Sequence, residues 1–403
     1  MKETDHGNAA PVREALSEED FMKIVIAMDS FKGSLSAMEA GEAARDGVLR
    51  VYPDAEIEVA ALADGGEGTV RAIVGATGGR LERVTVHDPL GRTVEAEYGV
   101  IGGTQTAVME MAEASGLTLL SEEERDPMRT STFGFGEMIA DAIGKGYRDF
   151  VIGIGGSATN DGGFGMLRAL GFAFSDGKGN PITLGAEGLR DLARIEKDGA
   201  LATLPECRFT VACDVKNPLC GENGCSAVFG PQKGASPAAV KEMDALLSRY
   251  AALTADLIGA DFSAYEGSGA AGGLGFAFLA YLNASLRSGA QTVIEATSLA
   301  EKIRGADVLI TGEGRLDFQS SMGKAPVEAA KLAKQYGKRV IALAGSVSDS
   351  ASLSRIREID AFFPIVGAPC SLAEAMETEN ARRNMARTAE QAFRLVKAFR
   401  PAE

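Results

Sequence analysis

Glycine-rich loops carry the side chains of this sequence that are best suited to chemistry. In the first, Asp29-Ser30-Phe31-Lys32-Gly33-Ser34, the start of the following helix would favour a carboxylate or phosphate, with Lys32 as a positive charge. A tight turn with a solvated lysine is the alternative. The second, Asp64-Gly65-Gly66-Glu67-Gly68-Thr69, has two carboxylates that can reach a metal or hydroxyl groups, and a flexible turn is its alternative.

The third loop, GIGGSATNDGGFG at 153–165, follows an apolar run. Gly153, Gly155 and Ala158 imitate the G-x-G-x-x-A fingerprint of dinucleotide-binding proteins, a match of low specificity on its own. The polar turn Thr159-Asn160-Asp161-Gly162-Gly163 that comes next favours a phosphate- or substrate-binding nest with a carboxylate beside it. A glycine-rich connection between a strand and a helix is the alternative.

The fourth loop, at 312–324, combines the acids Glu313 and Asp317 with the cations Arg315 and Lys324. Acids suit magnesium and cations suit phosphate oxygens, so this combination favours phosphoryl transfer. The loop is not a P-loop, because its residues do not fit the pattern G-x-x-x-x-G-K-[ST].

Further polar groups come from three other segments. CDVKNPLCG at 213–221 brings Asp214 and Asn217 to the end of a predicted strand, and FGPQKGAS at 229–236 adds Lys233 just before a helix. GSGAAGGLGFA at 267–277 is either another anion nest or a helix whose small residues allow close packing.

The scarcity of histidine narrows the reaction class. Only His6 and His87 occur, so proton transfer must fall to a carboxylate or a lysine, and a structural zinc site is not expected. The sequence has neither a G-x-S-x-G motif nor a Cys-His pairing for nucleophilic hydrolysis. Many glycine amides together with Asp, Glu, Lys and Arg side chains suit phosphoryl transfer, which depends on positioning and on neutralising charge.

The composition disfavours several classes of partner. The 403 residues carry a formal net charge of -15 and contain no tryptophan, which argues against binding DNA or RNA. No apolar run reaches the roughly 18 residues of a membrane span. Residues 1–21 are polar, and we expect them to form a flexible N-terminal extension without a signal core. Five cysteines without paired spacing indicate free thiols, so we expect a cytoplasmic protein.

The elements that hold the loops alternate between strand and helix at both ends of the chain. Strands are predicted at 23–28, 56–62, 307–312, 339–345 and 362–366. Capping boxes at Ser36–Glu39 and Ser371–Glu374 predict the start of the first and of the last helix. This alternation is typical of a parallel sheet with loops at the carboxyl ends of its strands.

The middle of the chain has a different pattern. The turn DPLG at 88–91 indicates a hairpin, and strands are expected at 149–156, 209–215 and 226–230 among helices. We therefore predict an α/β protein in which a Rossmann-like parallel-sheet domain is formed by residues 22–88 and 290–403. A mixed α/β domain, residues 89–289, is inserted into it.

Together, these segments resemble one known family. From about residue 22 nearly to its end the chain resembles the two-domain bacterial glycerate kinases, which share IVIAMDSFKGSLSA, ADGGEGT, GGSATNDGGFGML, CDVKNPLCG, FGPQKGA, GSGAAGGLG and GEGRLDFQSSMGKAP in this order. The resemblance implies transfer of the ATP γ-phosphate to D-glycerate in a cleft between the two domains, with magnesium. The expected product is 2-phosphoglycerate, and 3-phosphoglycerate is the alternative. Met28 replaces a usual proline and Phe318 a usual small or polar residue, and neither change removes a charge.

On this resemblance we assign roles as hypotheses. The chemistry is assigned to Lys32 and to Asp214 or Asp161, one of which takes the proton of the attacking hydroxyl. The groups expected to bind glycerate are Asp29, Ser30, Lys32, Asp64, Asn217 and Arg315. Those expected to bind ATP are Gly155, Gly156, Ser157, Asn160, Gly162, Gly163, Lys233, Gly269, Gly272 and Lys324. Magnesium is assigned to Asp64, Glu313 and Asp317, directly or through water.

Two other functional classes stay open at this point. A dinucleotide-dependent oxidoreductase would account for the spacing of Gly153 to Ala158, and a non-enzymatic module binding a sugar acid or nucleotide would account for the loops. Acids concentrated in glycine-rich loops favour the kinase, because a binding protein gains nothing from burying metal-binding carboxylates. The sequence does not predict the oligomeric state.

Overall fold

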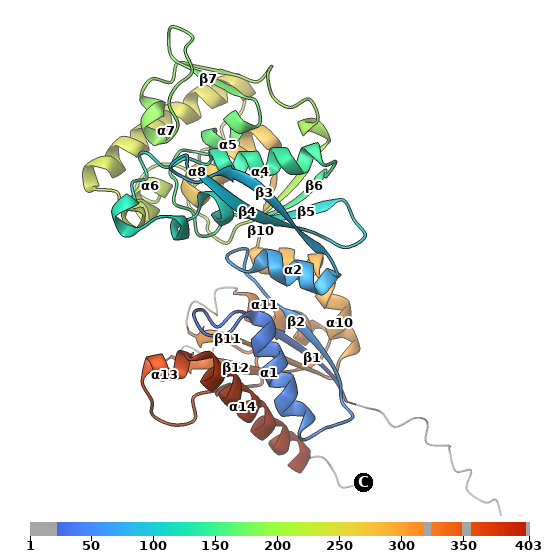
Figure 1. The fold of residues 1–403 in the computed structure, drawn as a ribbon. Helices are drawn as coiled ribbons and strands as arrows, with labels where there is room; N and C mark the ends of the chain where they lie inside the picture. The colour runs from blue at the N-terminus through green and yellow to red at the C-terminus, as the bar shows by residue number, and fades with distance from the viewer. Residues whose placement is uncertain (1–21, 318–323, 349–355, 400–403) are drawn as a thin grey trace, which may run out of the picture.

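The computed structural model describes residues 22–317, 324–348 and 356–399. The predicted N-terminal extension and positions 318–323 of the fourth loop lie outside the described residues. The described chain forms two α/β halves, one built from both ends of the sequence and one from its middle (Figure 1). The predicted fold class is therefore confirmed.

The first half is built on a parallel sheet of five strands in the order β13-β12-β11-β1-β2. The strands are β1 (Lys23–Met28), β2 (Glu56–Ala61), β11 (Val308–Leu316), β12 (Arg339–Val347) and β13 (Ala361–Pro364). Strand β1, which lies between β11 and β2, is an apolar run because helices cover both faces of the sheet. One face packs against α1 (Ala37–Leu49) and α14 (Thr378–Ala398), and the other against α9 (Gly289–Ala296), α10 (Leu299–Gly305) and α11 (Ala325–Gln335).

Both predicted capping boxes form, but the second one opens a different helix from the one expected. Ser36 and Glu39 cap α1. Ser371 and Glu374 cap the short helix α13 (Leu372–Met376), and the last helix, α14, begins only after the extended residue Glu377. The capping pattern thus located a helix start correctly, and the extended backbone at Glu377 divides the expected helix in two.

The second half is built on a six-stranded mixed sheet in the order β10-β9-β6-β5-β4-β3. Its strands are β3 (Arg80–His87), β4 (Thr93–Val100), β5 (Thr106–Glu110), β6 (Asp149–Gly153), β9 (Arg208–Ala212) and β10 (Ser285–Arg287). The predicted hairpin at 88–91 joins β3 to β4. Because β3 pairs with β4, residues 80–87 lie in this sheet, although the domain boundary was placed at residue 88.

Helices and a small hairpin complete the second half. They are α3 (Ala112–Ser115), α4 (Phe133–Gly144), α5 (Phe164–Ala169), α6 (Cys225–Phe229), α7 (Pro237–Ile258), α8 (Ala270–Leu282) and the pair β7 (Ala173–Ser175) and β8 (Arg194–Glu196). The strand expected at 226–230 is wrong, because these residues form α6 and the turn after it. A short apolar run cannot be assigned to strand or helix from periodicity alone.

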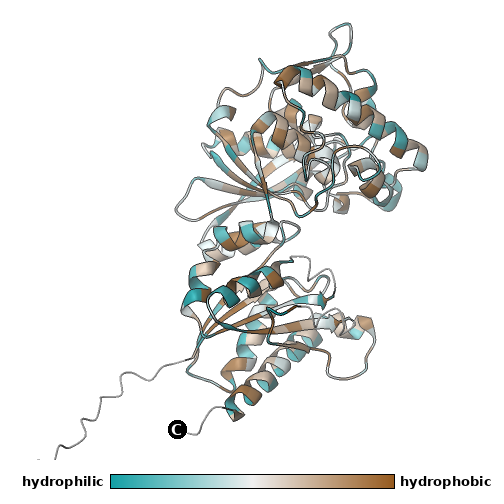
Figure 2. Ribbon diagram, turned by 180° about the vertical axis from the view of Figure 1, so that it is seen from behind, coloured by the Kyte–Doolittle hydropathy of each residue, from teal (hydrophilic) through white to brown (hydrophobic). Residues whose placement is uncertain are grey.

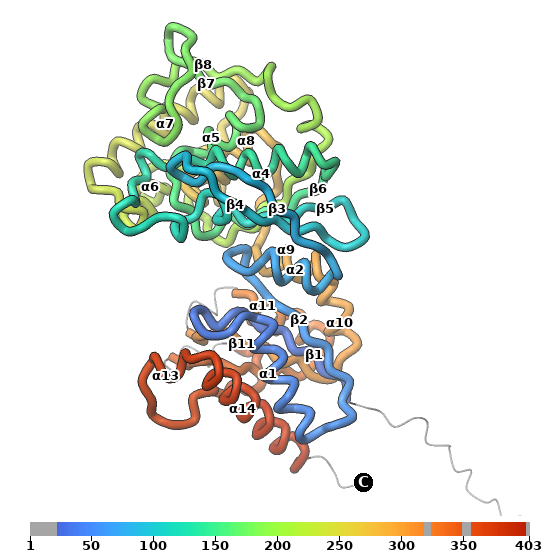
Figure 3. The backbone as a smooth tube through the Cα atoms, viewed as in Figure 1, coloured from blue at the N-terminus to red at the C-terminus, as the bar shows by residue number. Residues whose placement is uncertain are grey.

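Two helices connect the halves. Helix α2 (Thr69–Thr77) contacts β2 on one side and β4 and β5 on the other, and α9 contacts both β9 and α11. Figure 3 shows α2 and α9 side by side between the two sheets. An apolar cluster that includes Ile73, Val108 and Val293 fills this junction. The halves therefore meet through packed side chains and not only through the connecting chain.

Hydropathy along the described chain follows its strands and helices. Figure 2 shows hydrophobic residues concentrated along the strands of both sheets, with helices that alternate between hydrophilic and hydrophobic. In the described ranges no helix is long and apolar enough to cross a membrane. All five cysteines are free, as predicted.

Candidate functional site

Two cavities meet where the two halves face each other. The first, here called the sheet cavity, measures about 790 Å³ and lies at the carboxyl ends of the five-stranded sheet. The second, the interdomain cavity, measures about 410 Å³ and lies between that edge and the six-stranded sheet. Lys32 and Asp64 line both cavities, so a ligand in either one can reach them.

The sheet cavity lies at a switch point of the sheet topology. Strands β1 and β11 are neighbours, but the chain leaves β1 towards α1 on one face and leaves β11 towards α11 on the other. Divergence of two loops opens a crevice at the carboxyl ends of parallel strands, where such folds bind their ligands. Its lining includes the predicted residues Asp29, Ser30, Lys32, Asp64, Glu313, Arg315 and Lys324.

Carboxylates crowd the bottom of this crevice. Burial, together with the charges of Asp64 and Glu313, raises the pKa of Asp29 to about 6, so both of these acids lie close enough to repel Asp29. The N–H of Asp29 donates to the carbonyl of Gly312 at 2.9 Å, which ties the end of β1 to β11. Because the backbone holds these acids near one another despite their repulsion, a cation bound among them would be stabilised.

The fourth loop supplies cations at the rim of the crevice. Lys324 Nζ lies 3.1 Å from Oε2 of Glu313, whose side chain is buried. Arg315 Nε lies 3.6 Å from Oδ2 of Asp317 and is largely exposed. Both cations line the sheet cavity, whereas Asp317 contributes through its ion pair with Arg315. The structure thus brings the predicted acids and bases of this loop together at one edge.

The interdomain cavity contains a buried lysine. Lys233 lies at the end of a short 3-10 helix (Pro231–Lys233) and is only 3% exposed. Its Nζ donates to Ser157 Oγ at 2.6 Å and to the carbonyl of Thr159 at 2.7 Å. Burial lowers the pKa of Lys233 to about 8, because removing a charge from water disfavours it.

Asp214 is a carboxylate that lines the same cavity. It follows β9, lines the cavity, and accepts a hydrogen bond at 3.1 Å from the N–H of Gly289 at the start of α9. Burial raises its pKa, and the charge of Asp64 adds to the effect. A carboxylate with a raised pKa that faces a cavity can accept a proton from a bound hydroxyl.

Asp161, the other candidate base, lies in the protein interior. Its carboxylate is fully buried and accepts hydrogen bonds from the N–H and hydroxyl of Thr132, both at 2.9 Å, and from the N–H of Gly163 at 3.0 Å. It therefore holds the starts of α4 and α5 together. Burial raises its pKa and these donors oppose the rise. The structure does not bring Asp161 to either cavity.

Several other predicted residues also face protein and not a cavity. The amide of Asn160 donates to Ser226 Oγ at 2.8 Å, and that of Asn217 donates to the carbonyl of Asn223 at 2.8 Å. A Cβ at Gly272 would lie 2.0 Å from the carbonyl oxygen of Thr159. An added Cβ would also be too close to Leu247 and Tyr250 at Gly162, to Ala277 at Gly163 and to Pro218 at Gly269. Packing therefore accounts for these glycines.

The segment 267–277 forms the start of a helix, as one of the two interpretations predicted, and its backbone is irregular there. It contains the start of α8, yet Ala271, Gly272 and Gly273 have positive φ angles of 51°, 67° and 90°. Ala271 lines the interdomain cavity in this conformation, which is strained for a residue with a Cβ. Strained backbone beside a cavity is common at functional sites.

The fingerprint-like glycines of the third loop pack against the second loop. A Cβ at Gly153 would lie 2.4 Å from the carbonyl oxygen of Gly65, and one at Gly155 would lie 3.0 Å from the Cα of Gly66. The space that a dinucleotide pyrophosphate would need beside Gly153 is thus filled by the chain itself. This contact does not favour the oxidoreductase alternative, and it fixes the second loop against the six-stranded sheet.

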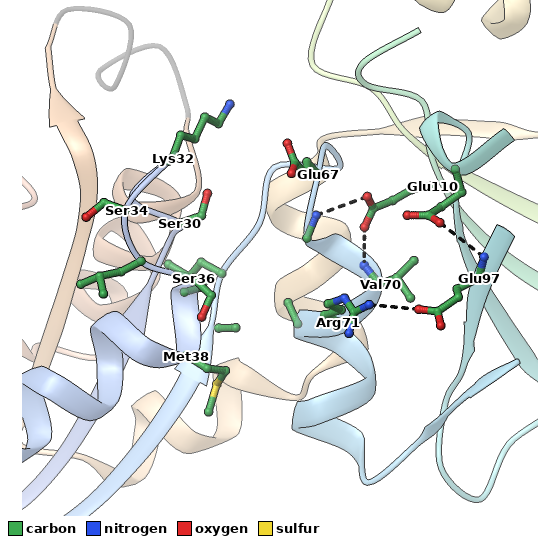
Figure 4. Close-up of a pocket in the computed structure, with 18 of the residues that line it drawn as sticks. Ser30, Lys32, Ser34, Ser36, Met38, Glu67, Val70, Arg71, Glu97 and Glu110 are labelled. Carbon is green, nitrogen blue, oxygen red and sulfur yellow. Dashed lines mark hydrogen bonds and ion pairs between the residues drawn. The ribbon is translucent and has the colours of Figure 1, made fainter. Parts of the chain in front are cut away.

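The sequence interpretation missed Glu110. This residue ends β5, and its carboxylate accepts hydrogen bonds from the N–H of Val70 at 2.8 Å and of Gly68 at 3.2 Å (Figure 4). The start of α2 in one half is thus capped by a carboxylate from the other, beside a third cavity of about 610 Å³. Burial raises the pKa of Glu110 to about 7. Asp29 and Asp64 lie in glycine-rich loops, whereas Glu110 is the last residue of the strand TAVME, so the pattern used for the loops could not find it.

The acids at the edge fit a magnesium ion that is shared with phosphates. In the described part of the chain, no group of three or more His, Cys, Asp or Glu side chains could enclose a metal alone. Magnesium in kinases is usually held by one or two carboxylates, by substrate phosphates and by water. Asp64 and Glu313, whose charges both act on Asp29, supply such oxygen ligands.

Comparison with known proteins gives a consistent result. A model of the glycerate kinase family matches residues 24–397. A glycerate kinase of Halalkalibacterium halodurans is 46% identical over 368 residues, which cover 90% of this chain and 97% of the relative. A glycerate 2-kinase of Escherichia coli is 46% identical over 372 residues, which cover 91% and 98%. A crystal structure from Salmonella typhimurium LT2, assigned as glycerate kinase 2, matches with a TM-score of 0.86 and 46% identity over 94% of this chain and 99% of that one.

Proposed function

This chain belongs to the glycerate kinase family, and we propose that it transfers the γ-phosphate of ATP to D-glycerate. The proposal depends above all on the two cavities that meet at Lys32 and Asp64, since a kinase must hold two substrates with their reacting atoms adjacent. The acids and cations around this meeting point suit phosphoryl transfer, which proceeds through positioning and charge neutralisation.

We assign the acceptance of the hydroxyl proton to Asp214. The proton passes from the attacking hydroxyl of glycerate to this carboxylate, the hydroxyl oxygen bonds to the γ-phosphorus, and the bond from that phosphorus to the bridging oxygen breaks to release ADP. Asp214 lines the interdomain cavity, in contrast to Asp161. Its raised pKa brings the carboxyl closer to the value at which a base works near neutral pH.

Lys32 is proposed to stabilise the transferred phosphoryl group, because it is the lysine that lines both cavities. Asp64 and Glu313 are the proposed magnesium ligands, with Asp317 contributing through water. A bound magnesium ion would neutralise part of the phosphate charge. The structure's contribution is to present these acids and cations on the ends of adjacent strands, where the backbone holds them in place.

The proposed product is 2-phosphoglycerate. The Escherichia coli relative is named a glycerate 2-kinase, and the coverage of both chains is nearly complete. Transfer to the terminal hydroxyl would give 3-phosphoglycerate and stays the alternative.

Phosphorus NMR of the reaction tests the proposal. Purified protein is incubated with D-glycerate, ATP and magnesium, and we expect a 2-phosphoglycerate signal that disappears when a chelator is added. A 3-phosphoglycerate signal would keep the reaction class and overturn the choice of hydroxyl. A folded protein that binds ATP and forms no phosphorylated product from glycerate would contradict the proposed function.

A further inference from the structure

Lys233 is a buried cation whose hydrogen bonds go to neutral groups. The residue is 3% exposed, two of its three N–H donors go to Ser157 Oγ and to the carbonyl oxygen of Thr159, and the charge of Asp161 acts on it from a distance. Within the described ranges it forms no ion pair with a carboxylate. A buried, unpaired charge is costly, and a ligand anion at the third donor would remove much of that cost.

The interdomain cavity offers this anion a small site. Lys233, Ser157 and Asp214 all line it. Of the third-loop glycines, Gly155 and Gly156 line the cavity, whereas Gly153, Gly162 and Gly163 pack against other parts of the chain and do not line it. At about 410 Å³ the cavity suits a small anion, one carboxylate with a hydroxyl near Asp214, which describes a short hydroxy acid.

The sheet cavity is large enough for a nucleotide and is lined by both apolar and cationic side chains. It is nearly twice as large, at about 790 Å³ against about 410 Å³, and within the usual range of roughly 300–1,000 Å³ for small-molecule sites. Its lining includes the apolar residues Pro364, Ile365 and Val366 after β13 and Leu372 and Met376 of α13. It also includes the cations Lys32, Arg315 and Lys324. Leu372 is 76% exposed, an apolar side chain that a bound ring would cover.

We propose that glycerate binds in the interdomain cavity with its carboxylate on Lys233 and Ser157, and that the adenine nucleotide binds in the sheet cavity. Lys32 and Asp64 then lie between the two substrates, where the phosphoryl group passes. This arrangement rests on the proposed function. It reverses the orientation predicted from the sequence, which placed glycerate at Arg315 and the nucleotide at Lys233.

One variant in each cavity tests the arrangement through the KM of each substrate. Lys233→Met removes the charge at similar volume, and we expect the KM for D-glycerate to rise about 10- to 100-fold with the KM for ATP within about 2-fold. Ala375→Phe projects a ring into the sheet cavity from α13, and we expect the KM for ATP to rise at least about 10-fold with the KM for glycerate unchanged. Matched controls are Lys241→Met on the exposed side of α7 and Ala373→Phe on the exposed side of α13, which should change neither KM.

The outcomes separate this arrangement from the proposed function. A wild-type protein without turnover contradicts the function itself. With an active wild type, a rise in the KM for ATP in Lys233→Met, or an equal rise in both, would overturn the arrangement. If Lys233→Met has no turnover, calorimetric titration decides: loss of D-glycerate binding with ATP binding kept supports the arrangement, and unchanged glycerate binding refutes it.

Discussion

Asp161 and Asp214 follow neighbouring strands, β6 and β9, of the same sheet, and burial raises the pKa of both. Their surroundings differ. Asp161 is enclosed by donors from Thr132 and Gly163, so its oxygens are used in holding two helices. Asp214 receives one backbone N–H, from Gly289, and faces a cavity. An acid in a glycine-rich loop at the end of a strand can therefore be an anchor or a reactive group, and its donors decide which.

The largest effect should come from Asp214. The substitution Asp214→Asn keeps the shape but removes the base, so we expect kcat to fall by about 10²- to 10⁴-fold. The free energy of unfolding should change by less than about 1 kcal/mol, because asparagine keeps an oxygen that can accept the 3.1 Å hydrogen bond from the N–H of Gly289. Steady-state kinetics and urea unfolding measure the two quantities. A kcat within a few-fold of the wild type would remove Asp214 from the role of base.

For Asp161 we expect the reverse: substitution should lower the stability strongly and change kcat little. Asp161→Ala leaves the buried donors of Thr132 and Gly163 without an acceptor, and we expect the free energy of unfolding to fall by about 3 kcal/mol or more. Asp161→Asn retains one acceptor oxygen, so its free energy of unfolding should fall less than that of Asp161→Ala. Folded Asp161→Asn should keep kcat near the wild-type value, as measured under the same conditions as Asp214→Asn. A large loss of kcat in folded Asp161→Asn would contradict the interpretation of Asp161 as a structural anchor.

The same distinction applies to the glycines of the third loop. Gly153→Ala would place a Cβ 2.4 Å from the carbonyl oxygen of Gly65, which must shift the loop that carries Asp64. We expect a loss of about 1–3 kcal/mol in the free energy of unfolding together with a lower kcat. Gly144→Ala at the end of α4 is the matched control, because a Cβ there meets nothing within 4 Å. Equal effects of the two substitutions would show that the contact between the loops is unimportant.

Much of the fold and of the candidate site could be predicted from the sequence, and the residues whose roles could not be predicted have one feature in common. Apolar runs such as 23–28 identify strands, and the order of strand and helix predicts a parallel sheet whose loops meet at one edge. That reasoning placed Asp29, Asp64 and Glu313 at one edge, and all three line the sheet cavity. It could not separate Asp161 from Asp214, or find the cap at Glu110, because hydrogen bonds between distant segments such as 110 and 70 leave no local pattern in the chain.

The smallest effect concerns Glu110, the carboxylate that joins the halves. Its pKa is about 7 in the folded protein, above the ordinary value of 4.5, because it is buried and because Glu67 and Glu113 repel its charge. A carboxyl with a raised pKa binds its proton more tightly when folded, so its contribution to stability is complete below about pH 4.5 and declines as the pH rises towards about 7. Relative to Glu110→Gln, we therefore expect the wild type to lose up to about 1.4 kcal/mol between about pH 6 and pH 7. Urea unfolding at several pH values measures this difference, with Glu122→Gln at the exposed surface as the control of equal charge change. A difference that stays constant with pH would show that the carboxyl group of Glu110 does not titrate in this range, and that its hydrogen bonds from Gly68 and Val70 outweigh its burial.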